Sequence, residues 1–154
     1  MILLRMELVE LKTDNMKLEL KHLALYLPYG LKYRLHGNFP IQNGVDNWIE
    51  DIREISPFNF TLEKVLTWET CKPILRPLSD LTKEIEINGE RFVPSDKLML
   101  QKNQRGEWSF FMDEAITWEI EQAIEDVSKL FEWHFDVFGL IDQGLAIDIN
   151  TLYK

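Results

Sequence analysis

Glu132, His134 and Asp136 are the residues of this chain whose types and spacing could do chemistry. They stand at alternating positions, so on a β-strand all three side chains would share one face and could converge on a divalent metal. That arrangement would suit a metal-assisted hydrolase. On a helix, Glu132 and Asp136 lie one turn apart while His134 points nearly the opposite way. We favour the helix, in which His134 is a core residue with a ring nitrogen bonded to a neighbouring group.

Acidic residues around the last predicted strand form a second candidate site. Asp142 and Asp148 flank the segment LAIDI, and together with Asp136 they could supply oxygen ligands to a metal ion. The chain is rich in acids, however, so solvated surface carboxylates are the preferred interpretation. The sequence contains no HExxH pair, no glycine-rich phosphate loop and no GxSxG turn. We therefore expect no cofactor.

A long amphipathic helix over about 113–138 is the element that would position these groups. Asp113 is a suitable N-cap residue, and Gly139 is a typical residue just past a helix end. Gln143-Gly144 then predicts a turn into a closing strand, LAIDI. The core-facing stripe of this helix recurs at spacings of four and three residues: Ile116, Ile120, Ala123, Val127, Leu130, His134 and Val137.

The earlier elements are shorter. Apolar spacing predicts a helix over 16–27, which Pro28 and Gly30 would end, and alternation predicts a strand over 31–37. For residues 45–70 the sequence leaves two alternatives. There could be strands near 50–55 and 62–68, or VDNWIEDI could form a helical turn. Two prolines in KPILRPL predict an extended edge segment over 72–78, which cannot be a central strand. A short helix is predicted over 79–87, capped by Ser79.

These elements predict a single α+β domain. A chain of 154 residues suits one domain with a substantial core. We expect residues 16–154 to form that domain, with a small, mainly antiparallel sheet packed against the long C-terminal helix and short helices elsewhere. Residues 1–15 are expected to be a loosely attached N-terminal leader.

The acidic character of the chain limits its partners. The formal net charge is -9, and 113–138 alone carries eight acidic residues and one lysine. Direct nucleic-acid binding is not expected, because it needs clustered Lys and Arg. An acidic helix could instead mimic nucleic acid and inhibit a host enzyme, if its carboxylates were spaced like phosphates on the solvent face: Glu114, Glu121, Glu125, Glu132 and Asp136.

A protein contact is the other use of this helix. Trp118 and Trp133, with Glu121 and Glu125 beside them, could form a surface for a protein partner or for a second copy of the chain. Cys71 is the single cysteine, which excludes an intrachain disulfide framework and suits a reducing cytosol. No apolar run approaches the ~20 residues that span a bilayer, so no membrane association is expected.

Three segments together resemble a known family: LKHLALYLPYGLKY at 20–33, KPILRPLSDLTKEIEINGERFVP at 72–94, and LFEWHFDVFGLIDQGLAIDINTL at 130–152. They are similar to small uncharacterised proteins encoded by phages and prophages of Bacteroides-like gut bacteria. The resemblance implies a bacterial cytoplasmic setting, with the virion as an alternative. It carries no catalytic or binding residue. Leu25 stands where proline is usual in that family, and the similar proteins begin near Met16.

Three functions follow from these observations as hypotheses. The preferred one is a non-enzymatic phage or prophage accessory protein that acts by interaction. The alternatives are a metal-assisted hydrolase that uses the C-terminal acidic and histidine cluster, and an acidic nucleic-acid mimic that inhibits a host enzyme.

Overall fold

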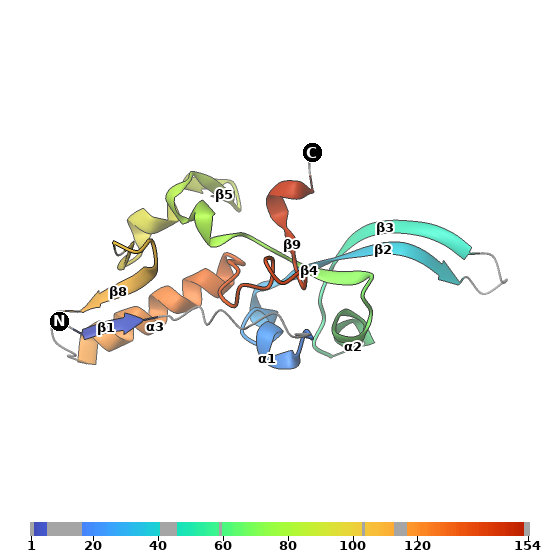
Figure 1. Cartoon of the computed structure of the whole chain (residues 1–154), viewed down its shortest axis with the longest axis horizontal. Helices are drawn as coiled ribbons and strands as arrows, with labels where there is room; N and C mark the ends of the chain where they lie inside the picture. The colour runs from blue at the N-terminus through green and yellow to red at the C-terminus, as the bar shows by residue number, and fades with distance from the viewer. Residues whose placement is uncertain are drawn as a thin grey trace.

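The computed structural model describes residues 2–5, 17–40, 46–58, 60–102, 104–112 and 117–152, with side chains described within 17–37, 51–58, 60–99, 104–108 and 121–152. The chain is α+β (Figure 1). Its strands there are β1 Ile2–Arg5, β2 Lys32–Pro40, β3 Asp46–Glu54, β4 Cys71–Leu75, β5 Ile85–Ile87, β6 Glu90–Phe92, β7 Leu100–Lys102, β8 Trp108–Met112 and β9 Ile147–Asp148. Its helices are α1 Leu20–Leu23, α2 Phe60–Thr67 and α3 Thr117–Glu132, with 3-10 turns η1 Leu27–Tyr29, η2 Leu78–Thr82, η3 Pro94–Lys97 and η4 Ile149–Thr151.

The larger sheet is four-stranded, in the order β3-β2-β4-β9. The predicted alternation of 31–37 is confirmed, because Leu31, Tyr33 and Leu35 are all buried on one face. α1 and α2 both cover that face, since Leu23 and Val65 belong to the same core cluster as these residues. The sheet is mixed: β2 pairs antiparallel with β3 and β4, whereas β9 runs parallel to β4.

β4 lies inside this sheet, so the expectation that 72–78 could not be a central strand is wrong. Antiparallel neighbours alternate between hydrogen-bonded and non-hydrogen-bonded pairs. The bond from His36 N–H to the Thr70 carbonyl, 3.0 Å, puts the Tyr33–Pro73 pair at a non-hydrogen-bonded position. The missing N–H of Pro73 therefore costs no bond to β2, and the pairing with β9 begins only at Ile74.

A second sheet, in the order β1-β8-β7, and the hairpin β5–β6 complete the strands described. β1 pairs antiparallel with β8, and residues 6–16 lie outside the described part of the chain. The separate leader over 1–15 therefore stays a prediction. A second core cluster gathers Leu81, Ile85, Trp108 and Leu130, which joins the hairpin region to α3.

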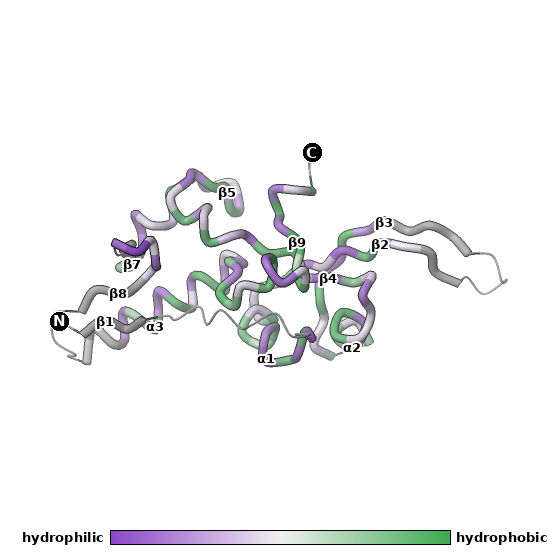
Figure 2. The backbone as a smooth tube through the Cα atoms, viewed as in Figure 1, coloured by the Kyte–Doolittle hydropathy of each residue, from purple (hydrophilic) through white to green (hydrophobic). Residues whose placement is uncertain are grey.

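α3 is amphipathic, and hydrophobic and hydrophilic positions alternate along it (Figure 2). Ala123 and Leu130 are buried, as the predicted stripe requires. Asp126 is also fully buried, and its carboxylate accepts the Met99 N–H at 2.8 Å. That bond ties α3 to the segment before β7, a contact the sequence pattern did not indicate.

The prediction of a helix reaching residue 138 is wrong, because α3 ends at Glu132. His134 has a φ of 60°, the left-handed conformation that ends helices. Its N–H donates to the Phe131 carbonyl at 3.0 Å, and the Phe135 N–H donates to the Leu130 carbonyl at 2.9 Å. These two bonds form a Schellman cap, with His134 in the place usually taken by glycine. The predicted start at Asp113 lies outside the described residues.

Three other predictions need correction. The helix expected over 16–27 is only α1, followed by η1, because Pro28 is accommodated in a 3-10 turn. The helix expected over 79–87 is η2 followed by β5, which pairs with β6 across Asn88-Gly89. The strand considered at 62–68 is the helix α2, whereas the strand alternative near 50–55 is confirmed in β3.

The cap at His134 gives the first test. Replacing His134 by Gly and by Ala removes the same ring, so the two variants differ in backbone preference alone. Because glycine adopts a positive φ without a Cβ clash, we expect His134→Gly to be more stable than His134→Ala by about 1 kcal/mol in urea unfolding. In a continuous helix the order would reverse by about the same amount, and that result would contradict the cap.

Candidate functional site

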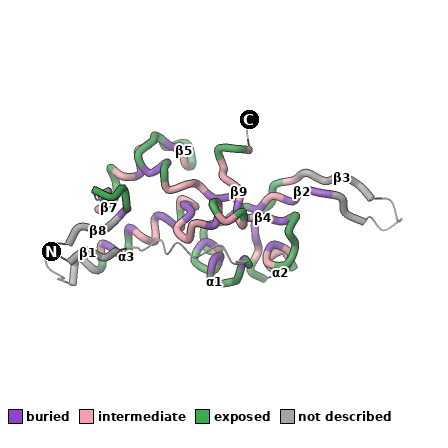
Figure 3. Tube along the Cα trace, in the orientation of Figure 1, coloured by how far each residue is buried: buried purple, intermediate pink, exposed green. Residues whose placement is uncertain are grey.

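The candidate site is the segment 132–141, which holds the predicted catalytic residues and crosses the middle of the molecule. Buried positions gather where this segment meets β4 and the end of β2 nearest to it (Figure 3). Arg76 pairs with it through the backbone: its N–H donates to the His134 carbonyl, and its carbonyl accepts the Asp136 N–H, each at 2.8 Å. The segment is thus held to the strand end by sheet-like bonds.

Tyr26 holds the same segment from the other side. Its side chain is fully buried, and its hydroxyl donates to the Phe135 carbonyl at 2.6 Å. The same hydroxyl accepts the Val137 N–H at 3.2 Å. Burial raises the pKa of Tyr26, so the hydroxyl keeps the proton that it donates. Two backbone groups of an irregular segment are satisfied by one side chain.

His134 contacts the turn after α1. His134 lies beyond the end of α3 and is half-buried, so its predicted place in the core stripe of the helix is wrong. The predicted bond to a neighbouring group is present, because its Nε2 lies 2.8 Å from the Tyr29 carbonyl. Burial lowers the pKa of His134, although this hydrogen bond opposes the change. The ring therefore helps to fix η1 against the helix end.

Asp136 is buried beyond the helix end. Its two carboxylate oxygens accept the N–H groups of Leu140 and Ile141, at 2.8 and 2.9 Å. Burial raises the pKa of Asp136, and this effect outweighs the backbone hydrogen bonds, which lower it. The carboxylate caps the turn over 136–141, and it does not lie on the solvent face that a nucleic-acid mimic would need.

The remaining carboxylates of the predicted sets have other surroundings, although the charge of Asp142 acts on Asp136 and also raises its pKa. Glu132 and Asp142 are exposed, and Asp148 accepts the Asn150 N–H at 2.8 Å, which begins η4. Within the described ranges, no group of three or more His, Cys, Asp or Glu side chains is placed to hold a metal ion. The catalytic set of Glu132, His134 and Asp136 and the metal set with Asp142 and Asp148 stay predictions.

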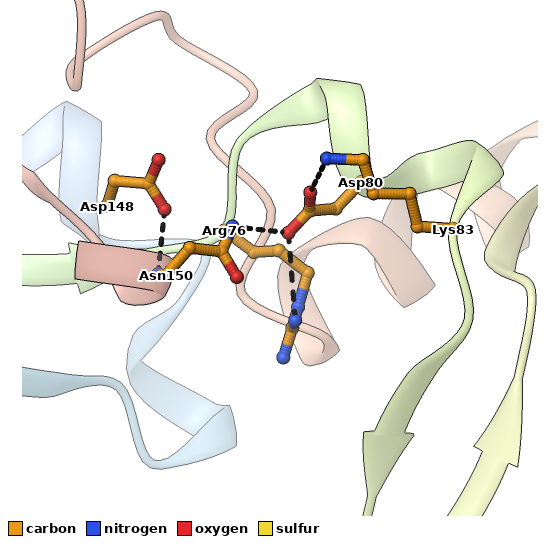
Figure 4. Close-up of polar contacts among 5 residues, drawn as sticks. All are labelled: Arg76, Asp80, Lys83, Asp148 and Asn150. Carbon is orange, nitrogen blue, oxygen red and sulfur yellow. Dashed lines mark hydrogen bonds and ion pairs between the residues drawn. The ribbon is translucent and has the colours of Figure 1, made fainter. Parts of the chain in front are cut away.

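A buried polar network next to the segment was not predicted. Asp80 is buried and accepts bonds from Lys83 Nζ at 3.1 Å and Asn150 Nδ2 at 2.8 Å (Figure 4). Arg76 Nη1 lies 3.9 Å from the same carboxylate, and burial lowers the pKa of Arg76. The network fastens the C-terminal η4 to η2, a structural role that suits a buried and paired acid.

The predicted interaction residues occupy different surroundings. Trp133 is half-buried and packs against Phe92, with ring centroids 5.0 Å apart. Glu121 and Glu125 are exposed on α3. Trp118 lies in α3, but its side chain is outside the described ones. The role of these residues in binding stays a prediction.

An exposed aromatic surface on α2 was missed. Phe60, Lys64 and Trp68 stand at intervals of four residues, so they line one side of the helix and its end. The rings of Phe60 and Trp68 meet edge to face at 6.3 Å between centroids. Phe58, just before the helix, is 96% exposed. The four-residue spacing is visible in the sequence, but it indicates a shared surface only if the segment is a helix, and the sequence left 45–70 open between strand and helix.

Comparison with protein-family models, with curated proteins and with solved structures finds no match to this chain. The resemblance to phage and prophage proteins therefore rests on the three sequence segments alone. In the described part of the chain, no helix combines the length and the apolar character that crossing a bilayer requires.

Tyr26→Phe tests the clamp on Phe135. The substitution leaves a buried carbonyl and a part-buried N–H without their partner, so we expect the free energy of unfolding to fall by about 1–3 kcal/mol. Tyr29→Phe is the matched control, because the Tyr29 side chain is exposed and should tolerate the change. Equal stability of the two variants in urea unfolding would show that the Tyr26 hydroxyl is not structural.

His22 gives a pH test. It is buried, and its Nδ1 accepts the Glu19 N–H at 2.9 Å, so a proton on that nitrogen would oppose the bond. Burial and then the charge of Lys21 lower its pKa from 6.5. The unfolded chain therefore binds more protons, and this stabilisation is present above pH 6.5 and lost as the pH falls.

The stability advantage of the wild type over His22→Gln should accordingly shrink as the pH falls from about 7.5 to about 5.5. Glutamine offers an oxygen to the Glu19 N–H but does not titrate in this range. Urea unfolding at several pH values measures the difference. An advantage that stays constant or grows towards acid pH would contradict the role of neutral His22.

Proposed function

We propose that this protein is a non-enzymatic interaction protein, and that it binds a protein partner through the α2 aromatic surface, defined as Phe58, Phe60, Lys64 and Trp68. The observation that carries the proposal is the exposure of three large aromatic side chains between residues 58 and 68: 96% for Phe58, 57% for Phe60 and 38% for Trp68. Contiguous exposed apolar surface marks interaction sites, and aromatic residues are enriched at interfaces.

The rings of Phe60 and Trp68 are held in place by contacts along α2. Lys64 Nζ lies 4.8 Å from the centroid of the Phe60 ring and 5.4 Å from that of the Trp68 ring, so it bridges the two. The opposite side of α2 is anchored in the core by Val65, which is buried, and by Leu62 and Leu66. Rings that are already positioned lose little conformational entropy on binding, and this favours affinity.

The net charge indicates the kind of partner. At -9, two copies of the chain repel each other, which favours a different protein over self-association. Glu63 and Glu69, which are neighbours of Lys64 and Trp68 in the sequence, are exposed. We therefore infer a partner that offers an apolar pocket with basic residues at its rim.

The resemblance to phage and prophage proteins supports an accessory role in a bacterial host cell, with the virion as the second setting. The contacts of His134 and Asp136 also support binding over catalysis. Both side chains are bonded to backbone groups of the fold. A hydrolase based on them would have to break those bonds to free its base and its metal ligand.

A photo-crosslinking amino acid at position 58 tests the proposal in host cells. We expect it to capture a defined protein, whereas the same probe at Ile124, 63% exposed on α3, should not capture that protein. The captured protein is then purified, and its affinity is measured for wild type and for Phe60→Ala and Trp68→Ala. Each variant should weaken binding by at least about tenfold, as interface aromatic residues do.

Ile124→Ala is the matched control, and its affinity should equal that of the wild type. Phe58→Ala adds a variant that leaves the fold intact, because truncation of so exposed a side chain changes stability by no more than about 0.5 kcal/mol. Unchanged affinity in all three aromatic variants would refute the proposed surface. Sedimentation that shows a dimer broken by Phe58→Ala would replace the partner with a second copy.

A further inference from the structure

The β2–β3 hairpin places one long strand at the border of the larger sheet. In the order β3-β2-β4-β9, β3 has a single neighbour among the described strands, which is β2. All nine residues of β3 pair with β2 in one continuous register, from Glu54 opposite Lys32 to Asp46 opposite Pro40. The hairpin extends beyond the other elements of the molecule (Figure 1). Within the described part of the chain, the outer side of β3 is therefore a sheet edge along its whole length.

Every second residue of β3 points its backbone groups out from this edge. The Ile55 N–H donates to the Leu31 carbonyl at 2.8 Å, so these two residues form a hydrogen-bonded pair just before the first pair of the ladder. Such pairs recur at every second position of an antiparallel ladder, so the backbone groups at 46, 48, 50, 52 and 54 face away from β2. Ile52 agrees with this phase, because its N–H donates to the Asp51 carboxylate at 2.9 Å.

β3 lacks most of the features that protect sheet edges from an added strand. Natural edges are protected by short strands, bulges, proline or lysine. β3 is long, its register has no bulge, and 46–54 contains neither proline nor lysine. The border of β2 beyond β4 differs, because it ends in Pro40, which has no N–H to donate. Of the two borders of the hairpin, the edge of β3 is the better template.

The charges of β3 select the kind of strand that can be added. Arg53 Nε lies 2.7 Å from the Asp51 carboxylate, so the one basic residue of β3 is compensated within the strand. A second copy would bring the same acidic strand, and like charges on neighbouring strands destabilise their pairing. A strand rich in Lys or Arg meets no such repulsion. The acidic residues of β3 are Asp46, Glu50, Asp51 and Glu54.

We propose that β3 binds an extended basic segment of a partner protein by strand addition. The backbone of the segment donates to the outward carbonyls of β3 and accepts from its outward N–H groups. At Ile52, a peptide carbonyl replaces the Asp51 carboxylate as the acceptor. This contact uses the backbone of β3, so it does not depend on the α2 aromatic surface and stands if that surface binds nothing.

A synthetic peptide of alternating Lys and Thr, as long as β3 and blocked at both ends, tests the edge on the full chain. Amide hydrogen exchange is followed by NMR during the titration. We expect saturable binding that slows exchange at 48, 50, 52 and 54, whereas 49, 51 and 53 already bond to β2 and change little. Binding without this alternation would overturn strand addition, as would the absence of binding.

Two controls test the choice of a basic segment. A peptide of alternating Glu and Thr has the same length and strand preference, and we expect it not to bind, because the acidic residues of β3 repel it. Equal affinity for the two peptides would overturn the basic preference. Slowed exchange at the same even positions when the concentration of the chain alone is raised would replace the partner with a second copy.

A proline at position 52 blocks the edge from the side of the protein. Ile52→Pro removes an outward N–H, which an edge strand tolerates, and Ile52→Thr is the matched control that loses the same side chain but keeps the N–H. We expect Ile52→Thr to bind the Lys-Thr peptide like the wild type and Ile52→Pro to bind it at least about tenfold more weakly. Equal affinity in a folded Ile52→Pro variant, with folding checked by urea unfolding, would overturn the proposal. The exchange pattern of the wild type tests the edge without any variant.

Discussion

The structure depends on the backbone conformation at the C-terminal end of α3. His134 takes a left-handed conformation, and the residue after it enters the core, where Phe135 is fully buried. A buried irregular segment must find partners for every backbone N–H and carbonyl. Here the Tyr26 hydroxyl and the backbone of Arg76 provide them. Because Tyr26 belongs to one core cluster and Phe135 to the other, this junction joins the two halves of the hydrophobic core.

This constraint also decides which residues are open to function. His134 and Asp136 look like catalytic groups by type and spacing, but they are bonded to the backbone that makes the junction. The surface proposed for protein binding lies elsewhere, on α2. Binding there would not remove a hydrogen bond on which the junction relies.

Local patterns in the sequence predicted the elements whose stability is local. The alternation of Leu31, Tyr33 and Leu35 predicted β2, and the stripe through Ala123 and Leu130 predicted the described part of α3. The end of α3 was not predictable, because Gly139 is the better local stop signal and the cap at His134 depends on Tyr29 and Arg76, which are distant in sequence. β4 can lie inside the sheet only because Pro73 is at a position where its missing N–H costs no bond to β2. The outward-facing backbone groups of β3 follow only from strand register, which no local pattern contains.

The central claim is that the chain works by binding a protein through α2, while the acidic helix α3 is architecture. Hydrogen–deuterium exchange of the chain with and without the captured partner tests it most directly. The account predicts that the partner slows exchange in residues 58–68 and leaves 121–132 unchanged. Slowed exchange confined to 121–132 would contradict it, because the acidic face of α3 would then be the binding surface.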